Sequence, residues 1–84
     1  MSAVAVSRDQ AIAAGRAIAS AADLGVLLRD RRKQLGYTQE FVASMLGFSP
    51  RLIGEMERGR GTVAFERMLA YANGLGIDLA AFTR

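Results

Sequence analysis

The stretch from Thr38 to Gly59 restricts the fold more than any other part of the chain, because it holds two sets of helix-boundary signals in close succession. Thr38 precedes a helix-forming run and can cap it with its hydroxyl group. Gly47 stands where that helix would end, at a position that favours a left-handed residue. Ser49 offers a second cap, and Pro50 follows at the first helical position, where its missing N–H costs no hydrogen bond.

The apolar residues of this stretch agree with those boundaries. Val42, Ala43 and Leu46 share one face of the first helix at helical spacing. The second helix is expected to run to about Arg58, with Gly59 closing it. Two short helices joined by a turn that contains glycine form a helix-turn-helix, which is the arrangement that the sequence predicts here.

These boundary and core residues resemble the pattern of the Cro/cI-type (XRE) helix-turn-helix family, over about residues 20–79. The resemblance implies an all-α, five-helix, lambda-repressor-like domain that binds DNA as a homodimer. The ending, from Arg60 to Leu79, is similar to the HipB-like antitoxin branch, which implies a HipA-like kinase toxin as a partner. The positions that carry the family pattern are Thr38, Gln39, Ala43, Gly47, Ser49, Ile53, Glu57 and Gly59.

Length and composition set further limits. A chain of 84 residues forms one domain and, at this size, buries only about 60–65% of its unfolded surface, so dimerisation would help its stability. The expected division is an extension over 1–19, the DNA-binding domain over 20–79 and a tail over 80–84. Cysteine and histidine are both absent, which removes disulfides, thiolate metal sites and the commonest general base. Glu55 and Glu57 stand two apart on a helix and face away from each other, so they do not form a carboxylate pair. Without these catalytic or metal-binding groups, we expect no enzymatic activity, no cofactor and no metal.

The charge is modest but suits nucleic acid. The formal net charge is +3, and all but one of the 11 cationic residues are arginine, the better bidentate partner of phosphate and guanine. No apolar run approaches the roughly 20 residues of a membrane span. Charged and polar residues interrupt the alanine-rich start and argue against a signal peptide, so a soluble, cytoplasmic protein is expected. Those residues are Arg8, Asp9, Gln10 and Arg16.

The N-terminal extension supports only loose expectations. The run from Val4 to Val6 fits either a disordered arm or a strand that pairs with another segment. Ser7 is a candidate cap for a weak helix over Arg8–Ala19, in which Gly15 lowers the helical propensity. This extension lies outside the family resemblance.

The first helix of the domain is expected over Ala21–Leu35, after a capping box at Ser20–Asp23. Its C-terminal half is basic, which fits a solvated face and the negative end of the helix dipole. The resemblance implies a more specific role for Arg32, which would form a buried ion pair with Glu57. Each of these two charges would need the other if both were buried.

Several large side chains near the helix-turn-helix have open roles. Tyr37 is expected to cap the core, and Met56 to fill it beside Ile53. Met45 could fill the core or lie on the surface, and the edge of the core is the preferred expectation. Phe41 lies off the buried face, where it would be either a partly exposed aromatic residue or a contact for a partner protein.

The C-terminal part reads as a helix region over Thr62–Gly76, starting between Thr62 and Glu66, and then a short strand over Ile77–Leu79. In the HipB-like branch the corresponding strand pairs across the dimer two-fold. The resemblance therefore implies a dimer interface here, and the alternative is an interface along the helix itself. The interface residues would be Leu75, Ile77, Leu79 and Phe82.

Two groups of residues are predicted to contact DNA, one at the base edges and one at the phosphates. The start of the second helix of the motif would enter the major groove, where Arg51 can bind guanine and Glu55 can accept a hydrogen bond from cytosine. Ser49 and Pro50 complete this base-facing group, and Pro50 offers only apolar contact. Phosphate contacts are expected from Thr38, Gln39, Arg58 and Arg60.

The preferred function is a repressor of palindromic operators that is also the antitoxin of a HipBA-like operon and autoregulates its promoter. Two alternatives stay open. One is a stand-alone XRE regulator without a toxin. The other is a protein-interaction module that has lost DNA binding, because Pro50 and Gly54 stand where longer polar side chains are usual in the family.

Overall fold

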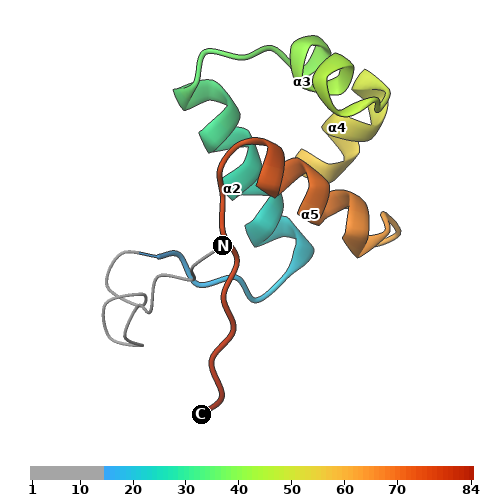
Figure 1. Cartoon of the computed structure of the whole chain (residues 1–84). Coiled ribbons are helices and arrows are strands. Elements are labelled where there is room, and N and C mark those ends of the chain that lie inside the picture. Colours follow the sequence, from blue (N-terminus) through green and yellow to red (C-terminus); the bar gives the residue numbers. More distant parts are fainter. Residues whose placement is uncertain (1–14) are drawn as a thin grey trace.

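The computed structural model describes residues 15–84, and this part of the chain is all-helical (Figure 1). Its elements are four α-helices, so the predicted all-α class agrees, whereas a fifth helix is not found in this part. No helix within residues 15–84 has the length and apolar character needed to cross a bilayer. The helices are α2 (Ala21–Gln34), α3 (Gln39–Leu46), α4 (Pro50–Glu57) and α5 (Phe65–Gly74).

Helix α2 begins where its capping signal predicts. The backbone N–H of Asp23 donates to Ser20 Oγ at 3.1 Å, and the Asp23 carboxylate accepts from the backbone N–H of Ala19 at 2.8 Å. The helix ends at Gln34, one residue before the predicted end. Residues 15–19 are not helical, so the weak helix predicted over Arg8–Ala19 is wrong there, and its other residues lie outside the described part, as does the run from Val4 to Val6.

The two capping signals of the helix-turn-helix are also confirmed. The hydroxyl of Thr38 accepts from the backbone N–H of Phe41 at 3.0 Å, and the hydroxyl of Ser49 accepts from that of Leu52 at 3.1 Å. Between the helices, Gly47 has φ = 73°, the left-handed conformation that residues with a Cβ rarely adopt. The caps and this glycine therefore set the turn that orients α4 against α3.

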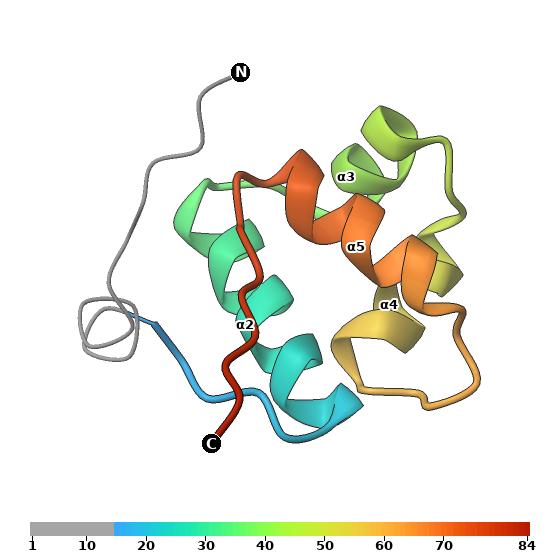
Figure 2. The ribbon, with the colours of Figure 1, turned by 60° about the horizontal axis from the view of Figure 1, so that its bottom comes forward.

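The core fills the space between all four helices, and α5 crosses the pair formed by α3 and α4 (Figure 2). Tyr71, Leu28 and Ile53 are among its largest fully buried side chains. Tyr37 packs against the core as expected, but Met45 is 45% exposed and not at the core edge, which Leu46 occupies instead. The buried residues are Leu24, Leu28, Val42, Ala43, Ile53, Met56, Met68, Tyr71, Ala72 and Leu75.

Glycine lets α2 approach the end of α4 closely. A Cβ on Gly25 would lie 2.6 Å from the carbonyl oxygens of Met56 and Glu57, well inside van der Waals contact. Gly59, with φ = 73°, passes equally close to Ala22, since a Cβ there would lie 2.4 Å from its Cα. This approach brings the end of α4 next to α2, and the side chain of Glu57 reaches Arg32.

The C-terminal segment differs from its prediction. Helix α5 begins at Phe65, within the predicted limits, and the backbone N–H of Ile77 donates to the Ala72 carbonyl at 2.9 Å beyond its end. The strand predicted over Ile77–Leu79 does not form, because residues 15–84 contain no second strand to supply hydrogen bonds to it. The segment instead leaves the end of α5 as an extended chain that passes α2 and continues beyond the helices (Figures 1 and 2).

Candidate nucleic-acid interface

The start of α4 presents a group of exposed side chains. Ser49, Pro50 and Arg51 are all exposed, while Glu55, one turn further along, is half-buried. The opposite face of α4 is fixed in the core by Ile53 and Met56. The first turn of this helix is therefore rigidly held and free to contact a partner, as the sequence predicts for a recognition helix.

The start of α3 carries two more of the predicted contacts. Thr38 is exposed, and its oxygen already accepts the capping hydrogen bond. Gln39 is half-buried, and its Nε2 donates to Glu57 Oε1 at 3.2 Å. One of the two amide hydrogens of Gln39 is thus committed inside the domain, and the other remains for a ligand.

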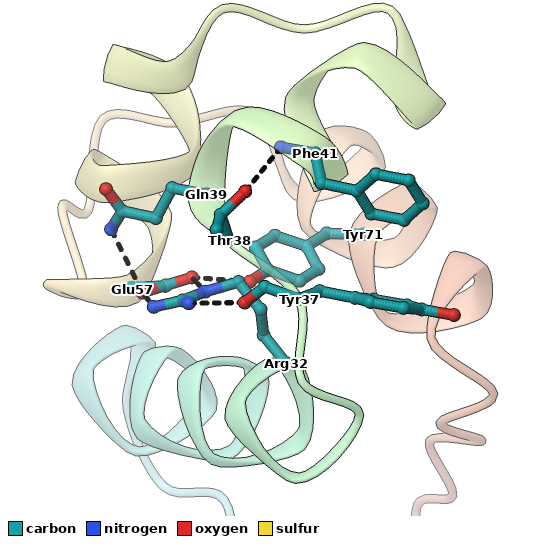
Figure 3. A network of polar contacts seen from close by, with 7 residues as sticks. All are labelled: Arg32, Tyr37, Thr38, Gln39, Phe41, Glu57 and Tyr71. Atoms are coloured by element: carbon teal, nitrogen blue, oxygen red, sulfur yellow. Dashed lines mark hydrogen bonds and ion pairs between the residues drawn. The ribbon is translucent and has the colours of Figure 1, made fainter.

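Arg32 and Glu57 form a bidentate ion pair. Arg32 Nε donates to Glu57 Oε2 at 2.7 Å and Nη2 donates to Oε1 at 2.9 Å, with Arg32 8% and Glu57 7% exposed (Figure 3). Arg32 Nη1 also donates to the backbone carbonyl of Tyr37 at 2.8 Å. The paired charges and the extra hydrogen bond meet the conditions under which a buried ion pair is tolerated.

A further member of this network, Tyr71 of α5, was missed by the sequence reasoning. Its hydroxyl donates to Glu57 Oε2, so the carboxylate receives hydrogen bonds from α2, α3 and α5 (Figure 3). The available signal was a tyrosine on the apolar face of α5, since a buried tyrosine hydroxyl needs a hydrogen-bond partner. That signal does not name the partner, which only the folded chain supplies.

The network fixes the charge states of its members. Burial by itself raises the pKa of Glu57, but hydrogen bonds from Arg32, Tyr71 and Gln39 outweigh burial and hold this pKa below its ordinary value. The hydrogen bond to Glu57 raises the pKa of Arg32. Burial, followed by the hydrogen bond to the carboxylate, raises the pKa of Tyr71. At neutral pH the site therefore holds a charged arginine–glutamate pair and a neutral phenol.

The two arginines that follow α4 lie differently from each other. Arg60 is exposed in the loop, where its backbone N–H donates to the Glu55 carbonyl at 3.1 Å. Arg58 turns back along the helix, and a Cβ on Gly54 would lie only 3.1 Å from its Nη1. Both arginines follow Glu57, the last residue of α4, but the side chain of Arg58 reaches back to Gly54.

The residues predicted for a dimer interface are split between core and surface. Leu75 is 2% exposed in the chain's own core, and Ile77 packs against that core. Leu79 and Phe82 are 37% and 42% exposed. Of these four side chains, only the last two therefore present a substantial surface to another molecule. Among the described residues, no cluster of three or more acidic side chains could hold a metal ion.

Comparison with known proteins agrees with this geometry. A helix-turn-helix family model matches residues 28–82, which include α3, α4 and α5 and make up well over half of the chain. No curated protein sequence matches the chain. The matched residues include every predicted contact for bases and phosphates. The chain belongs to the Cro/cI-type (XRE) helix-turn-helix family of DNA-binding regulators.

Proposed function

We propose that the protein is a transcriptional repressor that binds a palindromic operator as a homodimer. The observation that carries this proposal is the exposed first turn of α4, held by a capped and buried helix-turn-helix. In this motif the second helix enters the major groove with its N-terminal residues against the base edges.

Base reading is assigned mainly to Arg51. Its guanidinium is exposed and can donate two hydrogen bonds to guanine O6 and N7. Glu55 is half-buried and can accept from cytosine N4, while Pro50 offers apolar contact to a thymine methyl group. The hydroxyl of Ser49 keeps its hydrogen as a donor, because its oxygen accepts the capping bond.

Phosphate binding is assigned to Thr38, Gln39 and Arg60. Thr38 and Gln39 lie at the start of α3, where the positive end of the helix dipole and free backbone N–H groups favour an anion. Gln39 is pre-oriented by its hydrogen bond to the buried carboxylate of Glu57. Arg60 adds an exposed positive charge from the loop after α4.

The dimer is proposed to form through the segment from Ile77 to Arg84. This segment is extended, and its exposed apolar side chains, Leu79 and Phe82, suit a contact with a second copy. Two such segments pairing across a two-fold axis would supply backbone hydrogen bonds to the predicted strand over Ile77–Leu79. Two-fold symmetry would then place the two copies of α4 about 34 Å apart, in successive major grooves.

The biological role is proposed to be that of a HipB-like antitoxin that represses its own operon and binds a HipA-like kinase toxin. The resemblance of the stretch from Arg60 to Leu79 supports this role. Phe41 is half-exposed, its ring lies tilted against that of Tyr37 with centroids 4.7 Å apart, and it offers an apolar contact for a protein partner on α3. A kinase-like reading frame directly downstream would favour the antitoxin over a stand-alone regulator, and co-purification of the two products would test it.

The test of DNA binding is a gel shift with DNA from directly upstream of the gene, at several salt concentrations, against scrambled DNA. We expect tighter binding to the upstream DNA and a steep salt dependence. Arg51→Ala should cost about 1–3 kcal/mol on the operator and remove base preference at one position per half-site, whereas Arg60→Ala should weaken all sequences alike. Equal and weak binding to both DNAs by the wild type would favour an interaction module that no longer reads DNA.

A further inference from the structure

The side chain of Arg58 lies over α4, although the residue itself follows the end of the helix. Arg58 follows the last residue of the helix, and its backbone N–H still donates to the Gly54 carbonyl at 3.0 Å. Helical side chains lean toward the N-terminus, so the Arg58 side chain points back along α4. Its guanidinium consequently lies over the middle of the helix.

Gly54 supplies the space that this guanidinium occupies. A Cβ on Gly54 would have Nη1, Cζ and Nη2 of Arg58 as its nearest neighbours, at 3.1, 3.8 and 3.8 Å. A longer side chain at this position would meet the guanidinium and displace it. Gly54 itself has no side chain to contact DNA, but its small size leaves room for the Arg58 guanidinium.

The same guanidinium is available to a ligand. Arg58 is exposed, and within residues 15–84 it forms no ion pair or side-chain hydrogen bond. Arg51 stands seven residues earlier, so the Cα atoms of the two arginines lie on one side of α4, about 10 Å apart along the axis. Because the Arg58 guanidinium lies beside Gly54, three residues after Arg51, both guanidinium groups belong to the same helix face.

We propose that Arg58 is a second base-reading residue, directed into the major groove through the space at Gly54, and that it is not a phosphate contact. This assignment rests on the proposed DNA-binding function. Its planar guanidinium can donate two hydrogen bonds to a guanine at a base pair different from that of Arg51. Two arginines on one helix face would then compensate for Pro50, which reads no hydrogen-bonding group.

The first test measures base preference by selection from an operator library in which each position of the half-site is varied. Arg58→Ala should reduce discrimination at one base pair by about 5- to 150-fold and leave the base pair read by Arg51 unchanged. Arg58→Lys should keep the salt dependence of wild type but lose that discrimination, because lysine lacks the bidentate fork. Arg60→Ala is the matched control and should change affinity without changing preference.

The second test addresses the glycine. Gly54→Val should remove discrimination at the same base pair as Arg58→Ala, and the double variant should discriminate no worse than either single variant. Gly54→Ala, whose Cβ displaces the guanidinium by only a few tenths of an ångström, should retain most of the preference and shows that the helix tolerates a side chain there. Thermal melts of each variant confirm that the domain is folded.

Two outcomes overturn the proposal. If Arg58→Ala weakens operator and random DNA equally and lowers the salt slope as Arg60→Ala does, Arg58 binds phosphate. If the effects of Gly54→Val and Arg58→Ala on discrimination multiply, Gly54 does not direct Arg58. Failure of the proposed function itself looks different, because the wild type would then show no operator preference for any variant to lose.

Discussion

Tyr71→Phe removes a single hydrogen bond from the buried carboxylate of Glu57 and leaves the packing of the aromatic ring intact. Tyr71 is fully buried, and its hydroxyl donates to Glu57 Oε2, which also accepts from Arg32 Nε at 2.7 Å. A hydrogen bond to a charged group contributes about 1.5–3 kcal/mol. Since the carboxylate keeps its donors from Arg32 and Gln39, we expect the free energy of unfolding to fall by about 1.5–3 kcal/mol and no further.

Tyr37→Phe is the matched control. Tyr37 packs against the core and contacts the ring of Phe41, but within residues 15–84 its hydroxyl forms no hydrogen bond. Removing that hydroxyl should change the free energy of unfolding by at most about 0.5 kcal/mol. The difference between the two variants therefore isolates the contact with the carboxylate from the general effect of a tyrosine-to-phenylalanine change.

The assay is urea denaturation at pH 7, followed by circular dichroism, at one protein concentration for all variants so that any dimerisation contributes equally. Equal m-values would show that unfolding exposes the same amount of surface in each variant. If Tyr71→Phe is no more destabilising than Tyr37→Phe, the carboxylate is satisfied without the hydroxyl. The account of a carboxylate held from three helices would then be wrong.

Three further predictions concern the network and the dimer. Arg32→Met or Glu57→Leu alone should destabilise the domain by about 3–5 kcal/mol in the same assay, because each leaves a buried charge unpaired. The double variant should recover part of this loss, whereas small and additive effects would show that both side chains are solvated. The lowered pKa of Glu57 means that its contribution to stability is present above the ordinary glutamate pKa of about 4.3 and is lost as pH falls through the folded-state value. The raised pKa of Tyr71 means that its contribution is present below about 10 and is lost as pH rises beyond that value. Tyr71→Phe should therefore flatten the alkaline limb of a stability–pH curve and also weaken the acid limb, because the Tyr71 hydroxyl helps to lower the pKa of Glu57. Deleting residues 79–84 should convert a dimer into a monomer in sedimentation experiments, and a truncated chain that is still a tight dimer would move the interface to α5.

The parts of the fold that the sequence predicted are those set by local chemistry. The caps at Thr38 and Ser49 and the left-handed Gly47 depend on a few adjacent residues, so the helix-turn-helix follows from them directly. The end of α2 differs by one residue because helix ends depend on weak signals. Residues 15–19 are not helical, which agrees with Gly15 and with the lack of a clean apolar face to bury.

Other features depend on residues that are far apart in sequence. The pair of Arg32 and Glu57 was suggested by family resemblance, whereas the hydrogen bond from Tyr71 depends on how α5 crosses the other helices. The Arg58 guanidinium occupies space that is open because Gly54 has no side chain. From the sequence alone, the same glycine indicates only the loss of a DNA contact. The strand predicted over Ile77–Leu79 needs hydrogen bonds from a second strand, and residues 15–84 contain none.

Glu57 connects the stability of this domain to its proposed DNA surface. Its carboxylate accepts hydrogen bonds from α2, α3 and α5, and Gln39, the proposed phosphate contact, is among the donors. Arg51 and Arg58 are exposed, and within residues 15–84 their side chains form no hydrogen bond or ion pair. Substitutions at these two arginines should therefore change which DNA is bound with little effect on stability, whereas substitutions around Glu57 should change stability and phosphate binding together. Measuring unfolding and operator affinity for both groups of variants separates these effects, and a loss of stability in Arg51→Ala or Arg58→Ala would contradict this division of α4.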